Sequence, residues 1–419
     1  MGPCRLRTRE AREQTLAVKL SDRSAVLAAP SPLALAVEAA RRRPGFVDLT
    51  LSNPTSAGLS YAAYAPQPLL APLGLAETDA AQRAERPPLY APDPLGLESA
   101  RRALARHWPG ERAPNPDHVL LLPSSSEAYH YLFMLLCDEG DAVLAPEPSY
   151  PLLAHLARYA GIRLEPYRLA YDGAWHIDLQ SVRSARSSRT RAIVLISPNN
   201  PTGSFTSPAE LSALARLGLP LVSDEVFAEY AFAPESVAQR SALYATDALT
   251  FCIDGLSKSA GLPQLKLSWI AASGPPALVH DAFERLAWLS DTYLSVATPV
   301  QLALPALLEQ APAFRAGLRQ RLLANRAALR ACLAGSAASV LHAEGGWYLV
   351  IRLPDVASEE DWILGLLERE SILVHPGHFY DFEPRPPHLV VSLLTREADL
   401  RRGAEAILRE VAVRSSGSG

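Results

Sequence analysis

The sequence predicts an α/β fold, with a large domain built on a mostly parallel sheet between helices and a smaller α+β domain. Three observations support this prediction. At 419 residues the chain is long enough to bury a large core. Unbroken apolar runs typical of buried strands recur through its middle, and helical stretches separate several of them. From about residue 296 the pattern changes to a long helical region followed by shorter, alternating strands.

The individual elements follow from local patterns. Ser31 and Pro32 before LALAVEAARRR predict a capped helix, and Gly96 leads into the amphipathic stretch LESARRALARHW. A further helix is expected in SEAYHYLFMLLC, and a long one over 314–334. Buried strands are expected at 118–122, 142–146, 192–197, 219–224, 249–254 and 267–272, with shorter ones near 347–352 and 388–393.

These patterns divide the chain into predicted domains. Residues 25–60 are expected to join the small domain, 61–295 to form the large domain and 296–412 to complete the small domain. Flexible segments are expected at 1–24, which is charged, and at 413–419, which is rich in serine and glycine.

Composition excludes several classes of protein. The net charge is −4 with acidic and basic residues intermixed, so neither a nucleic acid nor an anionic membrane is an expected partner. The four cysteines are far apart, and the start of the chain lacks the apolar stretch of a secretory signal. We therefore expect a cytoplasmic protein without disulfides. The ten histidines show no metal-binding spacing, so no metal site is expected.

Lysine usage draws attention to one segment. Of 40 basic residues only Lys19, Lys258 and Lys266 are lysines, and the last two lie eight residues apart. Arginine keeps its proton in proteins, whereas a lysine amine can lose it and form a Schiff base.

Three polar residues each lie at or just beyond the carboxyl end of a predicted strand. Asn200 lies in SPNNPTG, Asp224 in SDEVFAEY and Lys258 in DGLSKSAGLPQLKLSW. Taken alone, each has an ordinary structural explanation: a turn, a helix N-cap and a surface lysine, respectively. The carboxyl ends of parallel strands share one edge of a sheet, however, so all three side chains are expected to converge on one ligand.

The chemistry of this set indicates pyridoxal phosphate. A lysine amine condenses with an aldehyde, a carboxylate keeps a pyridine nitrogen protonated, and an amide hydrogen-bonds a phenolic oxygen. Ser124 and Ser125, at a predicted helix start, are candidates for binding the phosphate, although serines there also serve as plain caps. Lys266 is either a further phosphate ligand or a solvated loop lysine.

From about residue 45 to 410 the chain resembles the fold-type I pyridoxal-phosphate aminotransferases (class I and II). The resemblance is carried by LYAPDPLG, SSSEA, PEPSYP, SPNNPTG, SDEVF and GLSKSAGLPQLKLSW, in this order. It implies a sheet of the seven-stranded type within a large domain that binds the cofactor.

The resemblance also implies a role for each site residue. Lys258 would be the Schiff-base lysine and the base that moves the substrate proton, while Asp224 pairs with the pyridinium nitrogen. Asn200 would bond the ring oxygen and Tyr150 would stack on the ring. The phosphate would be held by Ser124, Ser125, Lys266 and, from the partner subunit of a homodimer, the residue equivalent to Tyr90.

The implied activity is ping-pong transfer of an amino group from an amino acid or amine to a keto acid. The same site would also serve a carbon–sulfur lyase or a decarboxylase, because all these reactions begin from the same carbanion. A regulatory protein with a retained fold is a third reading, but the segment before residue 45 is short for a DNA-binding domain and not strongly basic.

Several positions depart from the family pattern. Phe227 replaces a tyrosine that bonds the ring oxygen, a loss expected to raise the pKa of the imine. Gly255 stands where a phosphate-binding serine is common, Ser124 where a glycine is usual, and Lys266 where an arginine is usual.

Val390 is the most consequential departure. It stands where the family has the arginine for the substrate α-carboxylate, and a valine cannot bind a carboxylate. Either another arginine takes this role, with Arg385 as the candidate, or the substrate lacks a carboxylate there.

Overall fold

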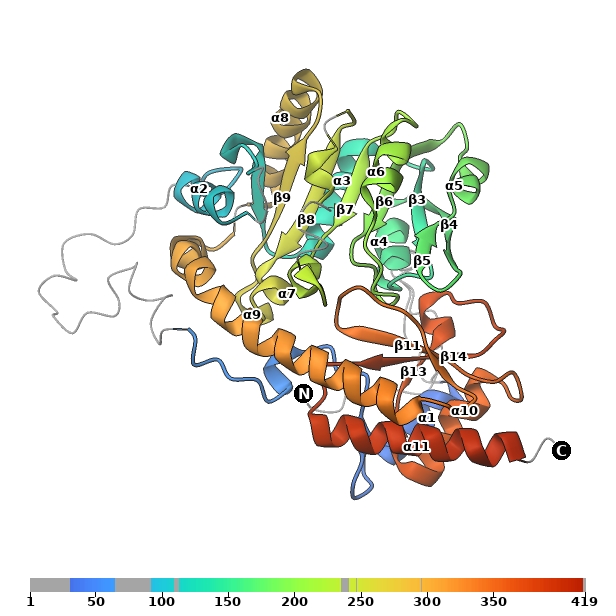
Figure 1. Cartoon of the computed structure of the whole chain (residues 1–419). Coiled ribbons are helices and arrows are strands. Elements are labelled where there is room, and N and C mark those ends of the chain that lie inside the picture. Colours follow the sequence, from blue (N-terminus) through green and yellow to red (C-terminus); the bar gives the residue numbers. More distant parts are fainter. Residues whose placement is uncertain are drawn as a thin grey trace, which may run out of the picture.

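The computed structural model describes residues 31–64, 92–108, 113–234, 241–245, 247–294 and 296–416. Figure 1 shows a wide twisted sheet with helices around it, a smaller body below, and the long helix α9 (Thr298–Leu333) running along both. Within these ranges no helix combines the length and the apolar character needed to cross a bilayer.

The large sheet has eight strands among the described residues, in the order β2-β9-β8-β7-β6-β3-β4-β5. The pairs from β4 through β3, β6 and β7 to β8 are parallel, whereas β9 runs antiparallel to both neighbours and β5 antiparallel to β4. The strand bounds are β2 Val119–Leu122, β3 Ala142–Glu147, β4 Arg163–Tyr171, β5 Trp175–Ile177, β6 Thr190–Ile196, β7 Leu221–Asp224, β8 Thr250–Gly255 and β9 Ser268–Ser273.

Helices cover both faces of this sheet, as expected for a mostly parallel sheet. One buried cluster joins α3, α4 and α8 to one face, and another joins α2, α5, α6 and the start of α9 to the other. The helices of this domain are α2 Glu98–His107, α3 Ser125–Leu136, α4 Leu152–Ala160, α5 Leu179–Ala185, α6 Pro208–Ala215, α7 Leu256–Ser259 and α8 Pro276–Tyr293.

The small domain is built on an antiparallel sheet of order β10-β11-β14-β13, beside the parallel pair β1–β12. Its strands are β1 Val47–Asp48, β10 Ser339–Val340, β11 Tyr348–Arg352, β12 Ile372–Leu373, β13 His375–Pro376 and β14 His388–Ser392. Its helices are α1 Pro32–Ala40, α10 Glu359–Gly365 and α11 Glu397–Ser416. The π-helical turn η11 Leu366–Glu370 follows α10 directly. Short 3₁₀ turns across the chain are η3 Pro54–Ser56, η6 Pro116–His118, η7 Ala228–Tyr230, η9 Ala242–Tyr244, η10 Pro263–Leu265 and η12 Gly377–Tyr380.

The prediction of an α/β fold with a smaller domain is confirmed, as are the six predicted strands of the large sheet. The sequence did not reveal β4 and β5, because β4 has only two buried residues and carries charges within RLEPYRLAY, while β5 is only three residues long. The helix expected over 314–334 begins much earlier, at Thr298, and includes Pro305 and Pro312. Its first part packs in the core of the large domain and its later part in that of the small domain.

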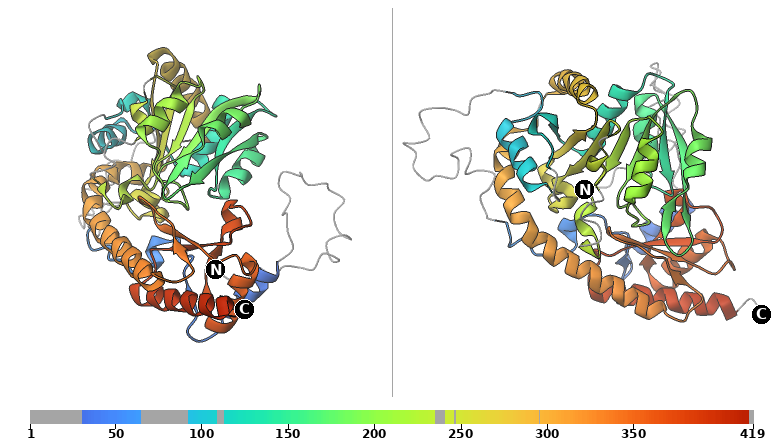
Figure 2. Two further views of the ribbon diagram at one scale, coloured as in Figure 1. Left: turned by 45° about the vertical axis from the view of Figure 1, so that its right-hand side comes forward. Right: turned by 45° about the horizontal axis from the view of Figure 1, so that its top comes forward.

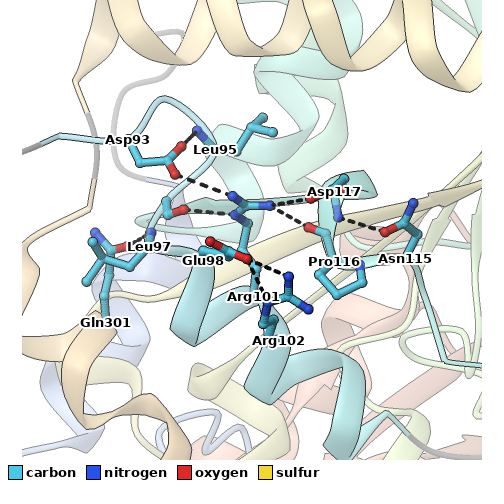
Figure 3. A network of polar contacts seen from close by, with 11 residues as sticks. Asp93, Leu95, Leu97, Glu98, Arg101, Arg102, Asn115, Pro116, Asp117 and Gln301 are labelled. Carbon is cyan, nitrogen blue, oxygen red and sulfur yellow. Dashed lines mark hydrogen bonds and ion pairs between the residues drawn. The ribbon is translucent and has the colours of Figure 1, made fainter.

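A buried arginine fixes the entry into the large domain (Figure 3). The Arg101 guanidinium on α2 donates to the carbonyls of Gly96 (2.9 Å) and Pro116 (2.7 Å). The amide of Leu97 donates to the side chain of Gln301 on α9, 2.6 Å away. These bonds satisfy buried backbone groups and hold the start of α2 against both β2 and α9.

The loop after β6 contacts the small domain at Gly203. Its carbonyl accepts hydrogen bonds from the amides of Glu344 (2.9 Å) and Gly345 (3.0 Å). Gly203 has φ +71°, and an added Cβ would lie 2.7 Å from the Cβ of Ala343. Glycine is therefore required both by backbone conformation and by the close approach of the two domains.

We expect Gly203→Ala to destabilise the protein more than Gly218→Ala. Both glycines have φ +71°, but a Cβ at Gly218 meets nothing within 4 Å, so this control isolates the backbone cost. The control should lose about 1–2 kcal/mol, and Gly203→Ala about 1–3 kcal/mol more because it overpacks the interface. Urea unfolding would measure both; equal losses would contradict the close contact at Gly203.

Candidate active site

A cavity of about 370 Å³ lies where the large and small domains meet. This volume is within the range of small-molecule sites. The large domain contributes seven of the predicted site residues to its lining, namely Ser124, Ser125, Tyr150, Asn200, Asp224, Lys258 and Lys266. The small domain and the segment before it contribute Ser52, Tyr348, His375 and Tyr380. The structure thus places Asn200, Asp224 and Lys258 around one cavity.

Lys258 lies on the short helix α7, directly after β8. The Tyr230 hydroxyl donates to the Lys258 carbonyl (2.7 Å), and the Lys258 Nζ lies 5.3 Å from the centre of the Trp347 ring. Burial lowers the pKa of the Lys258 amine, and the Asp224 carboxylate opposes this shift. A lowered pKa increases the fraction of neutral amine, the form that attacks an aldehyde.

Asp224 is the last residue of β7 and lies close enough to Lys258 for the two charges to interact. Burial raises the pKa of Asp224 to about 6. Two hydrogen bonds oppose this rise, one from the Val226 amide (3.2 Å) and one from the Tyr129 hydroxyl (3.0 Å). A carboxylate held in this way can pair with a cationic group of a bound ligand.

Asn200 lies in the loop after β6 and is only 8% exposed. Among the described residues its Oδ1 has no hydrogen-bond partner. Unsatisfied amide atoms are costly when buried, and they are often completed by a ligand. Asn200 lines the same cavity as Lys258, so a hydrogen-bond donor of a ligand there would satisfy this oxygen.

The cavity ends at the N-terminus of α3. Ser124 is the N-cap, and its hydroxyl accepts from the Glu127 amide (3.2 Å), so capping is one of its functions. The amides of Ser125 and Ser126 belong to the first helical turn, which has no intrahelical acceptors. Together with the exposed Lys266 they provide an end of the cavity suited to an anion such as phosphate.

The remaining residues singled out from the sequence differ in where they lie relative to the cavity. Tyr150 lines the cavity and is 46% exposed, so its ring is available to a ligand. Tyr90 lies outside the described residues. Phe227 also lines the cavity, but it packs edge-on against Trp347 and offers no hydrogen-bonding atom.

Gly255 has a structural explanation. It pairs in register with Ser268 on β9, and a Cβ at position 255 would lie 2.8 Å from the Ser268 Cβ. The side chain of Ser268 thus occupies the space that a serine at 255 would need.

Arg385 lies away from the cavity. It is exposed, forms an ion pair with Asp355 (3.1 Å), and lines a separate hollow of about 590 Å³ with Arg168 and Arg352. Its suggested role in binding a substrate carboxylate is therefore not supported by its position. Val390 is fully buried in β14, between Val350 and His375.

Several lining residues were not predicted from the sequence, in particular Tyr129, His375 and Tyr380. Tyr129 lies one turn after the serine run, so helical spacing was the only signal for it. His375 and Tyr380 come from a segment that looked like a strand leading into a loop, and no local pattern related it to Lys258. Among the described residues, no group of His, Cys, Asp or Glu side chains is arranged to hold a metal ion.

Comparisons with known proteins agree with the fold. Alanine aminotransferase from Mycobacterium tuberculosis (strain H37Rv) is 29% identical over 329 residues, covering 75% of this chain and 76% of that protein. S-alkyl-thiohydroximate lyase SUR1 from Arabidopsis thaliana is 28% identical over 224 residues, covering 52% of this chain and 48% of that protein. The solved structure of alanine aminotransferase from Pyrococcus furiosus has a TM-score of 0.81 at 22% identity, covering 94% of this chain and all of that one.

The family model for aminotransferases of class I and II matches residues 75–407. The match includes every residue that lines the cavity except Ser52. The chain therefore belongs to the class I and II aminotransferases, enzymes of fold type I whose cofactor is pyridoxal phosphate.

Proposed function

We propose that this chain transfers an amino group from an amino acid or amine to a keto acid, by a ping-pong cycle in which Lys258 forms a Schiff base with the cofactor. The observation that carries the proposal is the shared cavity of Lys258 and Asp224, in which burial shifts the pKa of the amine down and that of the acid up. Opposed shifts of this kind are typical of functional sites.

The residues of the chain fit pyridoxal phosphate from end to end. Lys258 would attach it covalently through its amine and would then move the proton of the substrate. Asp224, which accepts a hydrogen bond from Tyr129, would pair with the ring nitrogen, and the buried amide of Asn200 would bond the ring oxygen. When bound, the protonated ring supplies an electron sink that stabilises a carbanion.

The other residues hold the cofactor in place. Ser124 and Ser125 at the start of α3, together with Lys266, would bind the phosphate. Tyr150, whose exposed ring lines the same cavity, would stack on the cofactor ring. A cytoplasmic homodimer, in which Tyr90 reaches the phosphate of the partner subunit, belongs to the same proposal.

A carbon–sulfur lyase is the alternative, favoured by the partial similarity to a plant lyase. Lys258, Asp224 and Asn200 would serve both reactions, because both begin with removal of the same proton. The two reactions differ in the fate of the amino group, which only a product measurement reveals.

Asp224→Asn should stabilise the cofactor-free protein at pH 7.5. A carboxyl with pKa about 6 when folded and 3.8 when unfolded binds more protons when folded, so stability falls as pH rises from about 4 to 6. Removing the charge should recover about 1–3 kcal/mol, and the gain should shrink below pH 6. Urea unfolding across pH measures this gain in the free energy of unfolding.

Asp178→Asn is the control. It should instead lose stability, because a hydrogen bond from Arg168 lowers the pKa of Asp178. A loss of stability in Asp224→Asn as well would contradict the inference that burial of the Asp224 charge destabilises the protein.

Lys258→Ala should abolish the visible absorbance of the imine while leaving the fold intact. Among the described residues Lys266 is the only other lysine, and it lies at the end of the cavity proposed to hold the phosphate. Lys266→Ala is the matched control, and it should keep the absorbance but bind the cofactor less tightly, by about ten-fold for a lost charged contact. Absorbance spectra and circular dichroism measure both effects. An unchanged spectrum in Lys258→Ala would rule out the assignment.

Stoichiometric conversion of bound cofactor to its amine form by an amino donor is the expected sign of transfer. The donors should include amines without a carboxylate, because Val390 offers no ion pair. Release of pyruvate and ammonia without any keto acid would instead establish the lyase.

A further inference from the structure

The small-domain wall of the cavity is formed by four hydrogen-bonding side chains. Tyr348 on β11, His375 on β13, Tyr380 in η12 and Ser52 before η3 all line it. Ser52 hydrogen-bonds the hydroxyl of Tyr348, and the Tyr380 hydroxyl lies 2.9 Å from the His375 Nδ1. The residues proposed to hold the cofactor come from the large domain, so these four side chains belong to the other part of the cavity lining.

No arginine lines the cavity among the described residues. Its two lysines, Lys258 and Lys266, both come from the large domain. In the small-domain sheet, His375 on β13 pairs with Val390 on β14, which pairs with Val350 on β11, so the imidazole is the only polar side chain in this row. Of these three residues, only His375 lines the cavity.

His375 is held as a neutral hydrogen-bond donor. Burial lowers its pKa, and Asp48, the charged group that faces it from β1, opposes the shift only in part. Burial also raises the pKa of Tyr380, so this phenol keeps its proton. We assign that proton as donated to the His375 Nδ1, which leaves the N–H on Nε2.

A wall of this kind distinguishes substrates by charge. A carboxylate placed there would lose its hydration without gaining a cationic partner, which is costly in a buried site. A hydroxyl or another uncharged polar group would be satisfied by the imidazole and the phenols.

We propose that this wall selects amino donors whose end next to the amine carries an uncharged hydrogen-bonding group instead of a carboxylate, with His375 as the residue that contacts it. The proposal rests on the proposed function, since it requires that the cofactor occupy the large-domain side of the cavity.

The test uses three ligands of the cofactor-free full chain, with dissociation constants measured by calorimetry. These are pyridoxamine phosphate and the reduced adducts of pyridoxal phosphate with alanine and with alaninol, which differ only in carboxylate against hydroxymethyl. We expect the alaninol adduct to bind about ten-fold tighter than the alanine adduct, the equivalent of one unsatisfied buried group. Equal affinities, or tighter binding of the alanine adduct, would overturn the inference. If none of the three binds, the proposed function itself fails.

Variants of His375 then locate the effect. His375→Leu should weaken the alaninol adduct about ten-fold and leave pyridoxamine phosphate unchanged, because the latter lacks the substrate end. His375→Arg should reverse the preference toward the alanine adduct, since a guanidinium pairs with a carboxylate. An equal loss for all three ligands in His375→Leu would show a merely structural role and contradict the contact.

Discussion

The register of three parallel strands is the constraint on which the site depends. Ile196 in β6 pairs with Asp224 in β7, which pairs with Ile253 in β8, so the three strands end at one level of the sheet. Asn200 and Lys258 follow within a few residues and enter the cavity from this shared edge. A slip of one residue in β7 would turn Asp224 to the other face of the sheet, so the buried apolar pattern of these strands also fixes the chemistry.

Further buried carboxyl groups lie near the same edge of the sheet. Glu225 and Asp254 lie close to Asp224, and burial raises the pKa of each. Glu225 is satisfied by the Ser241 hydroxyl (2.6 Å) and the Ala242 amide (2.8 Å), so it serves the structure of the β7–β8 edge. Asp224 instead lines the cavity, where burial of its negative charge destabilises the folded protein. A cationic group of a ligand would offset this cost.

The two domains contribute different chemical groups to the cavity. The large domain supplies the amine, the acid and the helix start, which are the groups that any reaction with this cofactor needs. The small domain supplies His375, Tyr348 and Tyr380, which form the wall that we propose to select the substrate. The close contact at Gly203 and the shared helix α9, whose course along both domains is seen in Figure 2, fix the two walls relative to each other.

The sequence by itself determined the strands that are buried on both faces, because their apolar runs are local and unbroken. It missed β4, because most residues of this strand are partly or fully exposed and its sequence mixes charged and apolar residues. It also pointed to Asn200, Asp224 and Lys258 as neighbours at one cavity, because each lies at or just beyond the end of such a strand and parallel strands share their carboxyl edge. Only the tertiary structure shows that His375 and Tyr380 line the same cavity and that Arg385 lies away from it. Those positions depend on how the small domain packs against the large sheet, and such long-range contacts leave no periodic signal in the chain.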